Sequence, residues 1–195
     1  MKSMNTLSDQ QLIHLYLDGD ADALSSLVHR YKDKIYTSIY LLVKDKYLAE
    51  DIFQDTFIKV INTLRAGKYN EEGKFLPWVT RIAHNLVIDH FRREKRTPLV
   101  DGGEDFDIFE VLGHYDESTE DRMVREQTYK DLKTLIHLLP AEQKEVLIMR
   151  HFGDMSFKEI AEVTDVSINT ALGRMRYALN NLRKMMQGKE MSLKN

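Results

Sequence analysis

Hydrophobic residues recur every three or four positions along most of this chain, which is the period of helices with one buried face. Ser8 and Gln11 have the spacing of a capping box for a short helix that stops before Gly19. Asp20 is the expected cap of a longer helix. Its apolar positions are Leu24, Leu27, Val28, Tyr31, Ile35, Ile39 and Leu42. The pattern predicts a helical protein from its first residues.

A third helix is expected over about 47–64, and it has two distinct faces. The predicted core stripe is Phe53, Phe57, Val60, Ile61 and Leu64. The other face mixes carboxylates with aliphatic side chains, as partner-binding faces often do. Its members are Leu48, Asp51, Asp55, Ile58 and Asn62. From this pattern alone, an ordinary solvent-exposed face is an equally good interpretation.

A fourth helix is expected over 77–96, opened by Pro77 in its first turn. Its predicted inward positions are Trp78, Ile82, Leu86, Val87 and Phe91. Basic, amide and aromatic side chains occupy the rest of the helix, a combination suited to single-stranded nucleic acid. The alternative is that the terminal basic residues complement the carboxyl end of the helix. The basic and amide positions are Arg81, His84, Asn85, Arg92, Arg93, Lys95 and Arg96, and the alternative concerns the last four of them.

The last third of the chain has the layout of a helix-turn-helix. Ser156 and Glu159 form a predicted capping box for a short helix. A turn at 164–166 follows, and Ser167 is the expected cap of a long last helix. Its core stripe is Ala171, Met175, Ala178, Leu182 and Met185, and the opposite side is polar and basic. Such a helix can present hydrogen-bonding residues to base edges and arginines to phosphates, although a plain surface helix has the same period.

Charge is divided unevenly between three segments. Residues 1–96 hold 15 Lys and Arg against 13 Asp and Glu, and residues 126–195 hold 11 against 9. Residues 97–125 hold 2 against 9, so this middle segment is strongly acidic. It also contains the pair Gly102 and Gly103. We therefore expect a flexible acidic linker between two small helical domains, an all-α fold with boundaries at 1–96, 97–125, 126–187 and a tail at 188–195.

Composition narrows the classes of function. The chain has 195 residues and no cysteine, which excludes disulfides, thiolate metal sites and cysteine nucleophiles. No apolar run is long enough to span a membrane and the start lacks a signal-peptide layout, so we expect a cytoplasmic protein without membrane insertion. Asp18, Asp20 and Asp22 resemble the start of a calcium loop, but Ala23 and His29 stand where glycine and glutamate are required. With no catalytic motif either, we expect neither an enzyme nor a metal or other cofactor.

Three stretches together resemble the small, two-domain extracytoplasmic-function (ECF) sigma factors of bacterial RNA polymerase, in the sigma-seventy family. The resemblance covers about residues 7–186. Each stretch is a weak pattern alone, but their order and distances match those of the family. They are Ala49 to Phe57, Phe75 to Arg93 and, further on, Leu139-Pro140 with Glu159 to Glu162.

The resemblance implies a role for each surface. The third helix would dock on the clamp helices of core RNA polymerase, and the flap would be a further contact. The fourth helix would melt and capture the minus-ten element, with Trp78 mainly in the core. The last helix would read the minus-thirty-five element as duplex. The implied polymerase-binding residues are Leu48, Asp51, Gln54, Asp55 and Ile58; the minus-ten residues are Arg81, His84, Asn85, Arg92, Arg93 and Arg96; and the minus-thirty-five residues are Asn169, Thr170, Gly173, Arg174, Arg176 and Tyr177.

The resemblance also bears on the linker and on regulation. In this family the linker threads through the channel that later holds RNA, where its carboxylates would take the place of RNA phosphates. A solvated tether, or a segment that folds back on the basic surfaces and is autoinhibitory, are the alternatives. An anti-sigma factor is a possible partner. Asp165 stands where members often have glycine, Leu172 where they often have a basic residue, and Gly173 where they often have serine, so base preference does not transfer.

Two other functions fit parts of the pattern. A stand-alone helix-turn-helix regulator predicts dimerisation and binding of a palindromic duplex by the isolated protein. An all-helical adaptor predicts no DNA dependence. Neither explains two basic surfaces on separate domains joined by an acidic segment, which a sigma factor explains.

Overall fold

The computed structural model describes residues 4–70, 74–94 and 132–192. The chain divides into two compact units between Asp105 and Phe106. The predicted acidic linker at 97–125 lies outside the described residues, as does Arg96. Over the described part every regular element is a helix, so the all-α prediction is confirmed.

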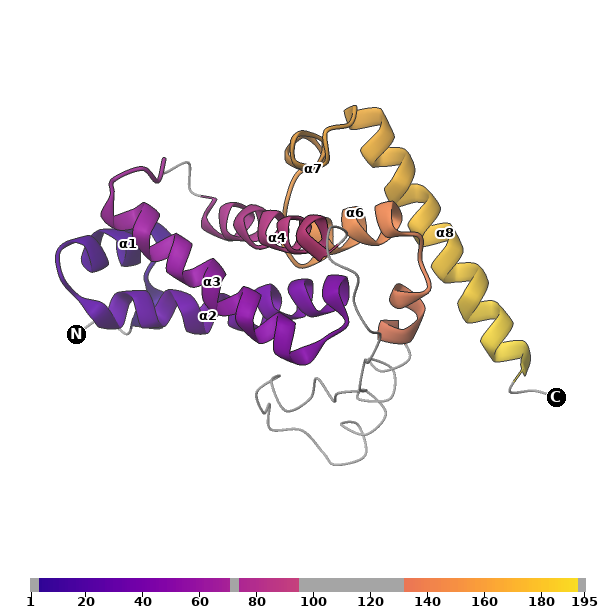
Figure 1. The fold of residues 1–195 in the computed structure, drawn as a ribbon, viewed down its shortest axis with the longest axis horizontal. Helices are drawn as coiled ribbons and strands as arrows, with labels where there is room; N and C mark the ends of the chain where they lie inside the picture. Colours follow the sequence, from indigo (N-terminus) through magenta and orange to yellow (C-terminus); the bar gives the residue numbers. More distant parts are fainter. Residues whose placement is uncertain (1–3, 71–73, 95–131, 193–195) are drawn as a thin grey trace. The chain divides into compact units, whose positions relative to one another are not determined.

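The described residues of the N-terminal unit form four α-helices and one short 3₁₀ helix (Figure 1). They are η1 (Met4–Thr6), α1 (Asp9–Leu17), α2 (Ala21–Val43), α3 (Lys46–Arg65) and α4 (Phe75–Glu94). Helix α2 packs against α1, α3 and α4, and α3 also packs against α4. The core between them is formed by buried side chains that include Leu12, Leu27, Ile39, Val60, Leu64, Phe75, Val79 and Val87.

The helix starts follow the predicted capping chemistry. Ser8 Oγ accepts from Gln11 N, and the Gln11 side chain accepts from Ser8 N, so the capping box is confirmed. Asp20 caps α2 by accepting from Asp22 N at 3.0 Å, again as predicted. Asp45 caps α3 in the same way, accepting from Leu48 N at 2.8 Å. These bonds satisfy backbone donors that have no partner within their own helix.

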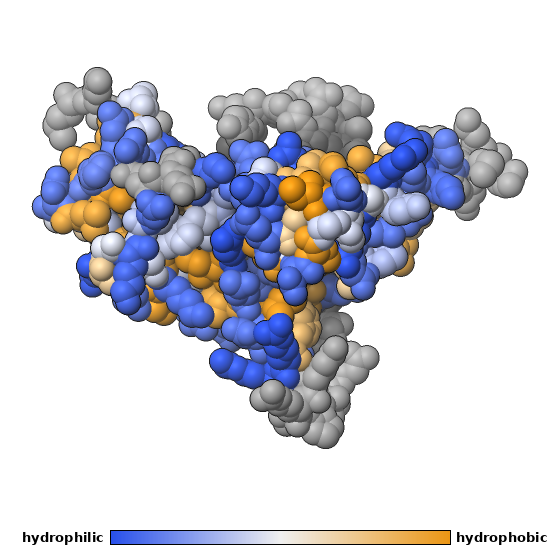
Figure 2. Space-filling model, turned by 90° about the horizontal axis from the view of Figure 1, so that it is seen from above, coloured by the Kyte–Doolittle hydropathy of each residue, from blue (hydrophilic) through white to orange (hydrophobic). Residues whose placement is uncertain are grey.

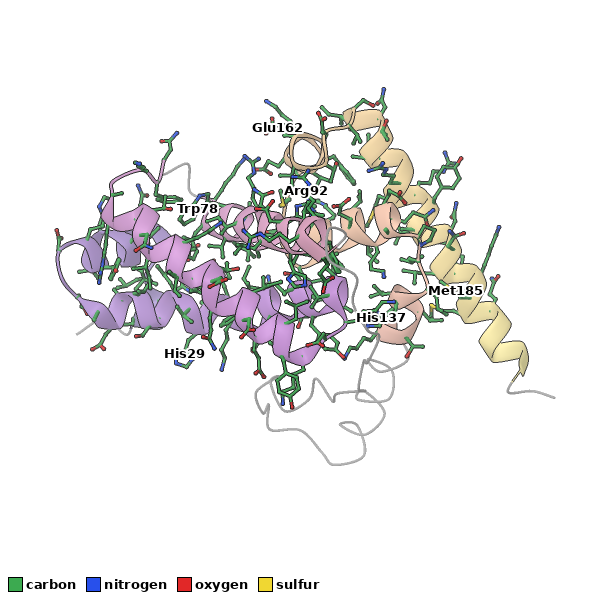
Figure 3. All side chains as sticks on the ribbon, in the orientation of Figure 1. His29, Trp78, Arg92, His137, Glu162 and Met185 are labelled. Atoms are coloured by element: carbon green, nitrogen blue, oxygen red, sulfur yellow. The ribbon has the colours of Figure 1, made fainter. Side chains whose placement is uncertain are left out.

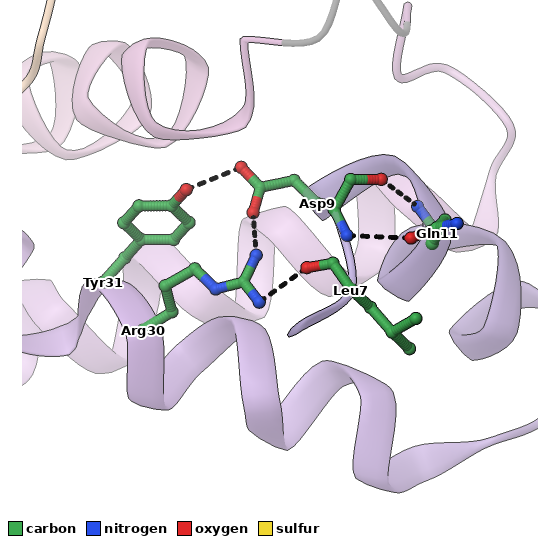
Figure 4. Close-up of polar contacts among 6 residues, drawn as sticks. Leu7, Asp9, Gln11, Arg30 and Tyr31 are labelled. Carbon is green, nitrogen blue, oxygen red and sulfur yellow. Dashed lines mark hydrogen bonds and ion pairs between the residues drawn. The ribbon is translucent and has the colours of Figure 1, made fainter. Parts of the chain in front are cut away.

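A polar cluster fastens α1 to α2 (Figure 4). The Asp9 carboxylate accepts from Arg30 Nη1 at 2.6 Å and from the Tyr31 hydroxyl at 2.7 Å. Arg30 Nη2 also donates to the Leu7 carbonyl at 2.8 Å. Burial, followed by the hydrogen bond to Asp9, raises the pKa of Tyr31 well above its ordinary value. The cluster positions the first helix against the scaffold that carries α3 and α4.

The C-terminal unit comprises helical residues 132–137 followed by α6 (Ala141–His151), α7 (Phe157–Thr164) and α8 (Ile168–Ser192). Helix α8 packs against α6 and α7. Its core contains the buried residues Val146, Met149, Met155, Ile160, Ala161 and Ala171, and Phe157, Val163, Val166 and Met175 pack against them. This unit therefore has a hydrophobic core of its own.

Two helices of the N-terminal unit are rotated from the predicted orientation. In α3 the buried positions include Ala49, Ile52 and Thr56, whereas Phe53 and Ile61 are only half-buried. In α4, which begins at Phe75 rather than Pro77, Val79 and Ala83 lie innermost, and Ile82, Leu86 and Phe91 are half-buried. The predicted stripe for α8 is correct, since Ala171, Ala178 and Leu182 are buried. The rotation of α4 changes which of its polar residues reach the surface.

Candidate nucleic-acid and partner interfaces

An acidic and aliphatic face runs along the outside of α3, and we call it the α3 face. It consists of Asp51, Gln54, Asp55 and Ile58, all exposed, with Leu48 half-buried at its edge. Ile58 is 53% exposed although it is aliphatic. The residues are three or four positions apart, which places them on one side of the helix. The structure thus brings together the five residues predicted as a partner-binding set.

Tyr47 is a further candidate for the α3 face that was not in the predicted set. It lies four residues before Asp51 and is 72% exposed. Large aromatic side chains are enriched at protein interfaces because they bury much area and keep a polar group. Its position at i−4 from Asp51 was the available signal in the sequence. It extends the α3 face to the start of the helix.

Helix α4 carries a polar and basic face that points away from α2 and α3, and we call it the α4 face. Asn85 and Arg92 are exposed and Arg81 is half-buried, and spacings of four and seven residues place all three on one side. Arg93 is exposed on a neighbouring side. Trp78 and Arg92 mark the two ends of the face in Figure 3. Asp89 lies 3.8 Å from Arg92 Nη1, so this arginine is partly neutralised.

His84 does not belong to the exposed part of α4. It is only 6% exposed and lies on the buried side of the helix with Thr80 and Ala83. The sequence placed it with the basic residues because a polar side chain on an amphipathic helix is normally assigned to the solvent face. Its predicted role near captured bases therefore lacks the exposure that a contact requires in this conformation.

Aromatic rings border the α4 face. Trp78 is half-buried and packs on Tyr69 and Phe75, with ring centroids 4.5 Å and 5.8 Å apart. Tyr69 follows α3 in the chain and was not singled out from the sequence, since it belongs to no helical period. Aromatic rings beside basic and amide groups suit unpaired bases, which stack on such rings.

The α7–turn–α8 segment has the geometry of a helix-turn-helix. Asp165 ends α7 in the left-handed conformation, with φ 51° and ψ 50°. Asp tolerates this region better than most residues, so the turn forms without glycine. Val166 N then donates to the Ala161 carbonyl at 3.0 Å, and Ser167 Oγ accepts from Thr170 N at 3.0 Å. The predicted cap of the last helix is confirmed.

The polar side of α8, which we call the α8 face, carries the predicted reading residues. Asn169, Thr170, Arg176 and Tyr177 are exposed, and Gly173 and Arg174 are half-buried. Tyr177 is 64% exposed. A Cβ at Gly173 would meet nothing within 4 Å, so packing in the free protein does not require glycine there. Five of the six lie away from the buried side formed by Ala171 and Ala178, and Arg174 lies on the flank of that side.

An arginine braces the helix-turn-helix from the side of α6. Arg150 Nη1 donates to the Met155 carbonyl at 2.8 Å, and its guanidinium lies 5.5 Å from the centroid of the Phe157 ring. The Ser156 and Glu159 capping box starts α7 at this point, as predicted. These contacts fix the loop before α7 and so orient the helix pair.

Three further properties of the described residues are the grouping of possible metal ligands, the apolar length of the helices and the pKa of a carboxyl group. Within 4–70, 74–94 and 132–192 no three His, Asp or Glu side chains are grouped as a metal site. None of the helices in the part that the structure describes is long and apolar enough to cross a membrane. On α2, burial raises the pKa of Asp33, with Lys32 and His29 acting in the opposite direction.

The described residues form a helix-turn-helix unit and a separate helical unit. The model of sigma-70 region 2 matches residues 27–97, and that of sigma-70 region 4 matches residues 129–180. The chain belongs to the ECF RNA polymerase sigma factors, which are transcription initiation factors and not enzymes. It is 30% identical to ECF RNA polymerase sigma factor SigW of Bacillus subtilis, over 87% of this chain and 91% of SigW. It is 32% identical to the RNA polymerase sigma-H factor of Pseudomonas aeruginosa, over 92% and 94%.

Solved structures share the fold. The sigma factor RpoE from Bartonella quintana, in complex with the anti-sigma factor NepR, superposes with a TM-score of 0.63 at 17% identity, covering 84% of this chain and 96% of that one. CnrH in complex with the cytosolic domain of CnrY gives 0.59 at 19%, covering 92% and 97%.

Proposed function

We propose that this sigma factor binds core RNA polymerase through the α3 face and selects promoters with the other two faces. The α8 face reads the minus-thirty-five element as duplex, and the α4 face holds the melted minus-ten strand. The observation that carries the proposal is the division of the polar surfaces between two units that have separate cores. One surface sits on a helix-turn-helix suited to a major groove, and the other on a helix bordered by aromatic rings.

The α8 face supports duplex reading because its residues divide into two functional groups. Asn169 and Thr170 lie at the start of the helix, where side chains of a recognition helix contact base edges. Arg174, Arg176 and Tyr177 follow one to two turns later, where they can contact phosphates. Gly173 lies between the two groups and allows the backbone close to DNA.

The α4 face supports strand capture by a different chemistry. Arg81 and Arg92 supply positive charge for phosphates, and Asn85 can hydrogen-bond an unpaired base. Trp78 and Tyr69 offer rings beside it. Arg93 extends the charge, and Arg96 lies outside the described residues. His84 would contribute only after a change that exposes it.

The α3 face supports protein docking since its chemistry is poorly suited to nucleic acid. Asp51 and Asp55 would repel phosphates, whereas Ile58 and Tyr47 offer apolar area. The proposed partner is the clamp helices of core polymerase, with the flap contacted by the C-terminal unit. We accordingly propose that the protein acts in the cytoplasm, together with the polymerase.

An anti-sigma factor is a further proposed partner. RpoE of Bartonella quintana was solved with the anti-sigma factor NepR. A partner of that kind would cover one or more of the three faces and so block polymerase or DNA. The acidic segment 97–125 is proposed to enter the RNA channel when the protein is bound to polymerase.

The proposal is tested by a pull-down of the purified protein with core RNA polymerase, followed by transcription from a library of random promoter DNA with and without it. Binding and new, sequence-restricted start sites are expected. Retention of palindromic duplex without polymerase binding would instead establish a stand-alone regulator. Failure to bind either polymerase or DNA would indicate an adaptor and overturn the proposal.

A further inference from the structure

An apolar stripe on α8 is exposed and lies beside the α8 face. It consists of Ile168, Leu172, Leu179 and Met186, which are between 44% and 50% exposed. Their spacings of four, seven and seven residues place them on one line along the helix. Figure 2 shows that such hydrophobic patches interrupt a described surface that is otherwise largely hydrophilic. We call these four residues the α8 stripe.

The two flanks of the α8 stripe differ in a way that restricts its occupant. On one flank Ala171 and Ala178 are fully buried in the core of the same unit, so that side is not available. On the other flank Arg176 and Arg183 are exposed, each four residues after a leucine of the stripe. An occupant must therefore supply apolar side chains and, along the open flank, negative charge.

A second copy of the chain does not meet this requirement. A symmetric antiparallel pair that joined two α8 stripes would bring the open flank of one copy against the open flank of the other, and a parallel pair would bring it against the side of α8 that is packed in the core. In the antiparallel pair Arg176 and Arg183 would face arginines, and like charges in contact are repulsive. A lipid surface is a poorer match, because the four apolar residues span only about 40° of the helix circumference, whereas the apolar face of an amphipathic helix typically spans about 100° or more.

The chain itself contains a segment with the required composition. Residues 106–112 read Phe-Asp-Ile-Phe-Glu-Val-Leu, with five apolar residues and two carboxylates but no basic residue. Acidic and apolar residues in alternation are typical of segments that bind apolar grooves with basic rims. The two carboxylates of the segment, Asp107 and Glu110, would balance the charges of the two arginines on the open flank.

The distance along the chain allows this contact within the C-terminal unit. Nineteen residues, 113–131, separate Leu112 from Leu132. A chain of that length spans roughly 65 Å when extended, whereas the α8 stripe is about 27 Å long. Because the segment and the stripe belong to one chain, binding is intramolecular and takes place at an effective concentration of about a millimolar.

We propose that residues 106–112 dock on the α8 stripe in the free protein and compete there with promoter DNA. The competition rests on the proposed function of the α8 face, but the docking does not. Arg176 belongs to both sites, so a carboxylate of the docked segment and a DNA phosphate exclude one another. When polymerase draws the acidic segment into its channel, the stripe is vacated and the helix becomes free to read duplex.

Disulfide formation tests the docking without DNA, because the chain has no cysteine of its own. Gly113→Cys is combined with Leu179→Cys on the α8 stripe or, as the matched control, with Lys184→Cys. Lys184 is exposed five residues further on, about 140° around the helix. We expect the intramolecular disulfide with position 179 to form at least about tenfold faster than with position 184. Equal rates overturn the docking, and a predominant disulfide between two molecules makes the second copy the occupant and also overturns it.

Duplex binding tests the competition. The triple variant Phe106→Ser, Ile108→Ser and Phe109→Ser keeps every charge, so general repulsion of DNA is unchanged. We expect it to bind a minus-thirty-five duplex about fivefold more tightly than the parent protein. The control Leu99→Ser, Val100→Ser and Tyr115→Ser changes three apolar residues outside the segment and should have no effect. A selective disulfide with unchanged affinity upholds the docking and overturns the competition. Absence of duplex binding in every variant refutes the proposed function of α8 instead.

Discussion

The two helices that carry the proposed nucleic-acid faces are packed in different ways. Helix α8 is buried along a narrow line through Ala171, Ala178 and Leu182. Helix α4 packs against both α2 and α3, and seven of its residues are buried: Phe75, Leu76, Val79, Thr80, Ala83, His84 and Val87. The difference leaves α8 free over most of its circumference and α4 free along one side only.

This difference has a functional consequence. A helix that inserts into a major groove must be accessible on three sides, and a narrow line of attachment permits that. A helix that holds a single strand needs one side, backed by a rigid scaffold. The wide burial of α4 supplies such a scaffold, and it also makes the helix sensitive to substitutions that α8 would accept.

The largest expected effect is on the affinity for core polymerase, which depends on the α3 face and not on the two proposed DNA faces. Asp51→Lys with Asp55→Lys should reduce affinity for core polymerase by about a hundredfold or more, since it reverses two charges at the α3 face. Surface plasmon resonance with immobilised core enzyme measures it. The control Asp18→Lys with Asp22→Lys makes the same change in net charge at exposed positions of the same unit outside α3 and should leave the affinity intact. Undiminished binding by the first pair would exclude the α3 face.

The next largest effect is on duplex binding by the exposed side of α8. Arg174→Ala with Arg176→Ala should weaken binding of the minus-thirty-five duplex by about 10- to 100-fold and lower its salt slope by up to about one per lost phosphate contact. Fluorescence anisotropy from 50 to 200 mM salt gives both quantities. Lys34→Ala, on an exposed position of the other unit, is the control. An unchanged slope would show that these arginines do not contact phosphates.

A third comparison sharpens the distinction between the buried and exposed sides of α4. His84→Ala should lower the free energy of unfolding by about 1–3 kcal/mol because it empties a buried position. Asn85→Ala, one residue further on, should leave stability nearly unchanged and weaken capture of a minus-ten single strand. Urea denaturation and strand-binding assays on both variants measure the difference. Equal stability of the two variants would contradict the assigned rotation of α4.

The same difference in packing explains which buried faces could be predicted from the sequence. The narrow stripe of α8 consists of small and apolar residues, so a 3.6-residue period identified it and its opposite face correctly. The buried side of α4 is wide and includes the polar residues Thr80 and His84. A prediction based on hydrophobicity alone therefore placed the buried face about one residue position away from the observed one. Tyr69 lies outside any helix and meets Trp78 only through tertiary packing. No periodicity could have found it.

A smaller effect, on the free energy of unfolding, is expected for substitutions in the turn between α7 and α8. Asp165→Gly should raise the free energy of unfolding by about 0.5 kcal/mol, because glycine adopts positive φ without steric cost. Asp165→Val should lower it by about 1 kcal/mol, since a β-branched residue is strained there. Thermal unfolding of the pair measures both. Destabilisation by glycine would mean that the Asp165 side chain stabilises the turn by more than the strain it bears.

The smallest effect is a pH dependence in the scaffold behind α4. Burial raises the pKa of Asp33, so its ionised form is less favourable in the folded protein than in the unfolded chain. The contribution of Asp33 to stability is therefore most favourable below the ordinary carboxyl pKa and declines as pH rises through the raised value. Asp33→Asn should raise the melting temperature at pH 7, with a gain that vanishes on acidification. Asp18→Asn at an exposed position is the control, and a gain independent of pH would contradict the burial effect.

The separate core of the N-terminal unit also has a consequence during synthesis. The helices of that unit that the structure describes end at Glu94, and about 100 further residues must be translated before α8 ends at Ser192. At about 5–20 residues per second this takes roughly 5–20 s, whereas small helical bundles fold in microseconds to milliseconds. The α3 face is therefore formed on the ribosome seconds before the helix-turn-helix exists. The proposed docking face of a nascent chain is therefore exposed before the proposed reading helix has been made.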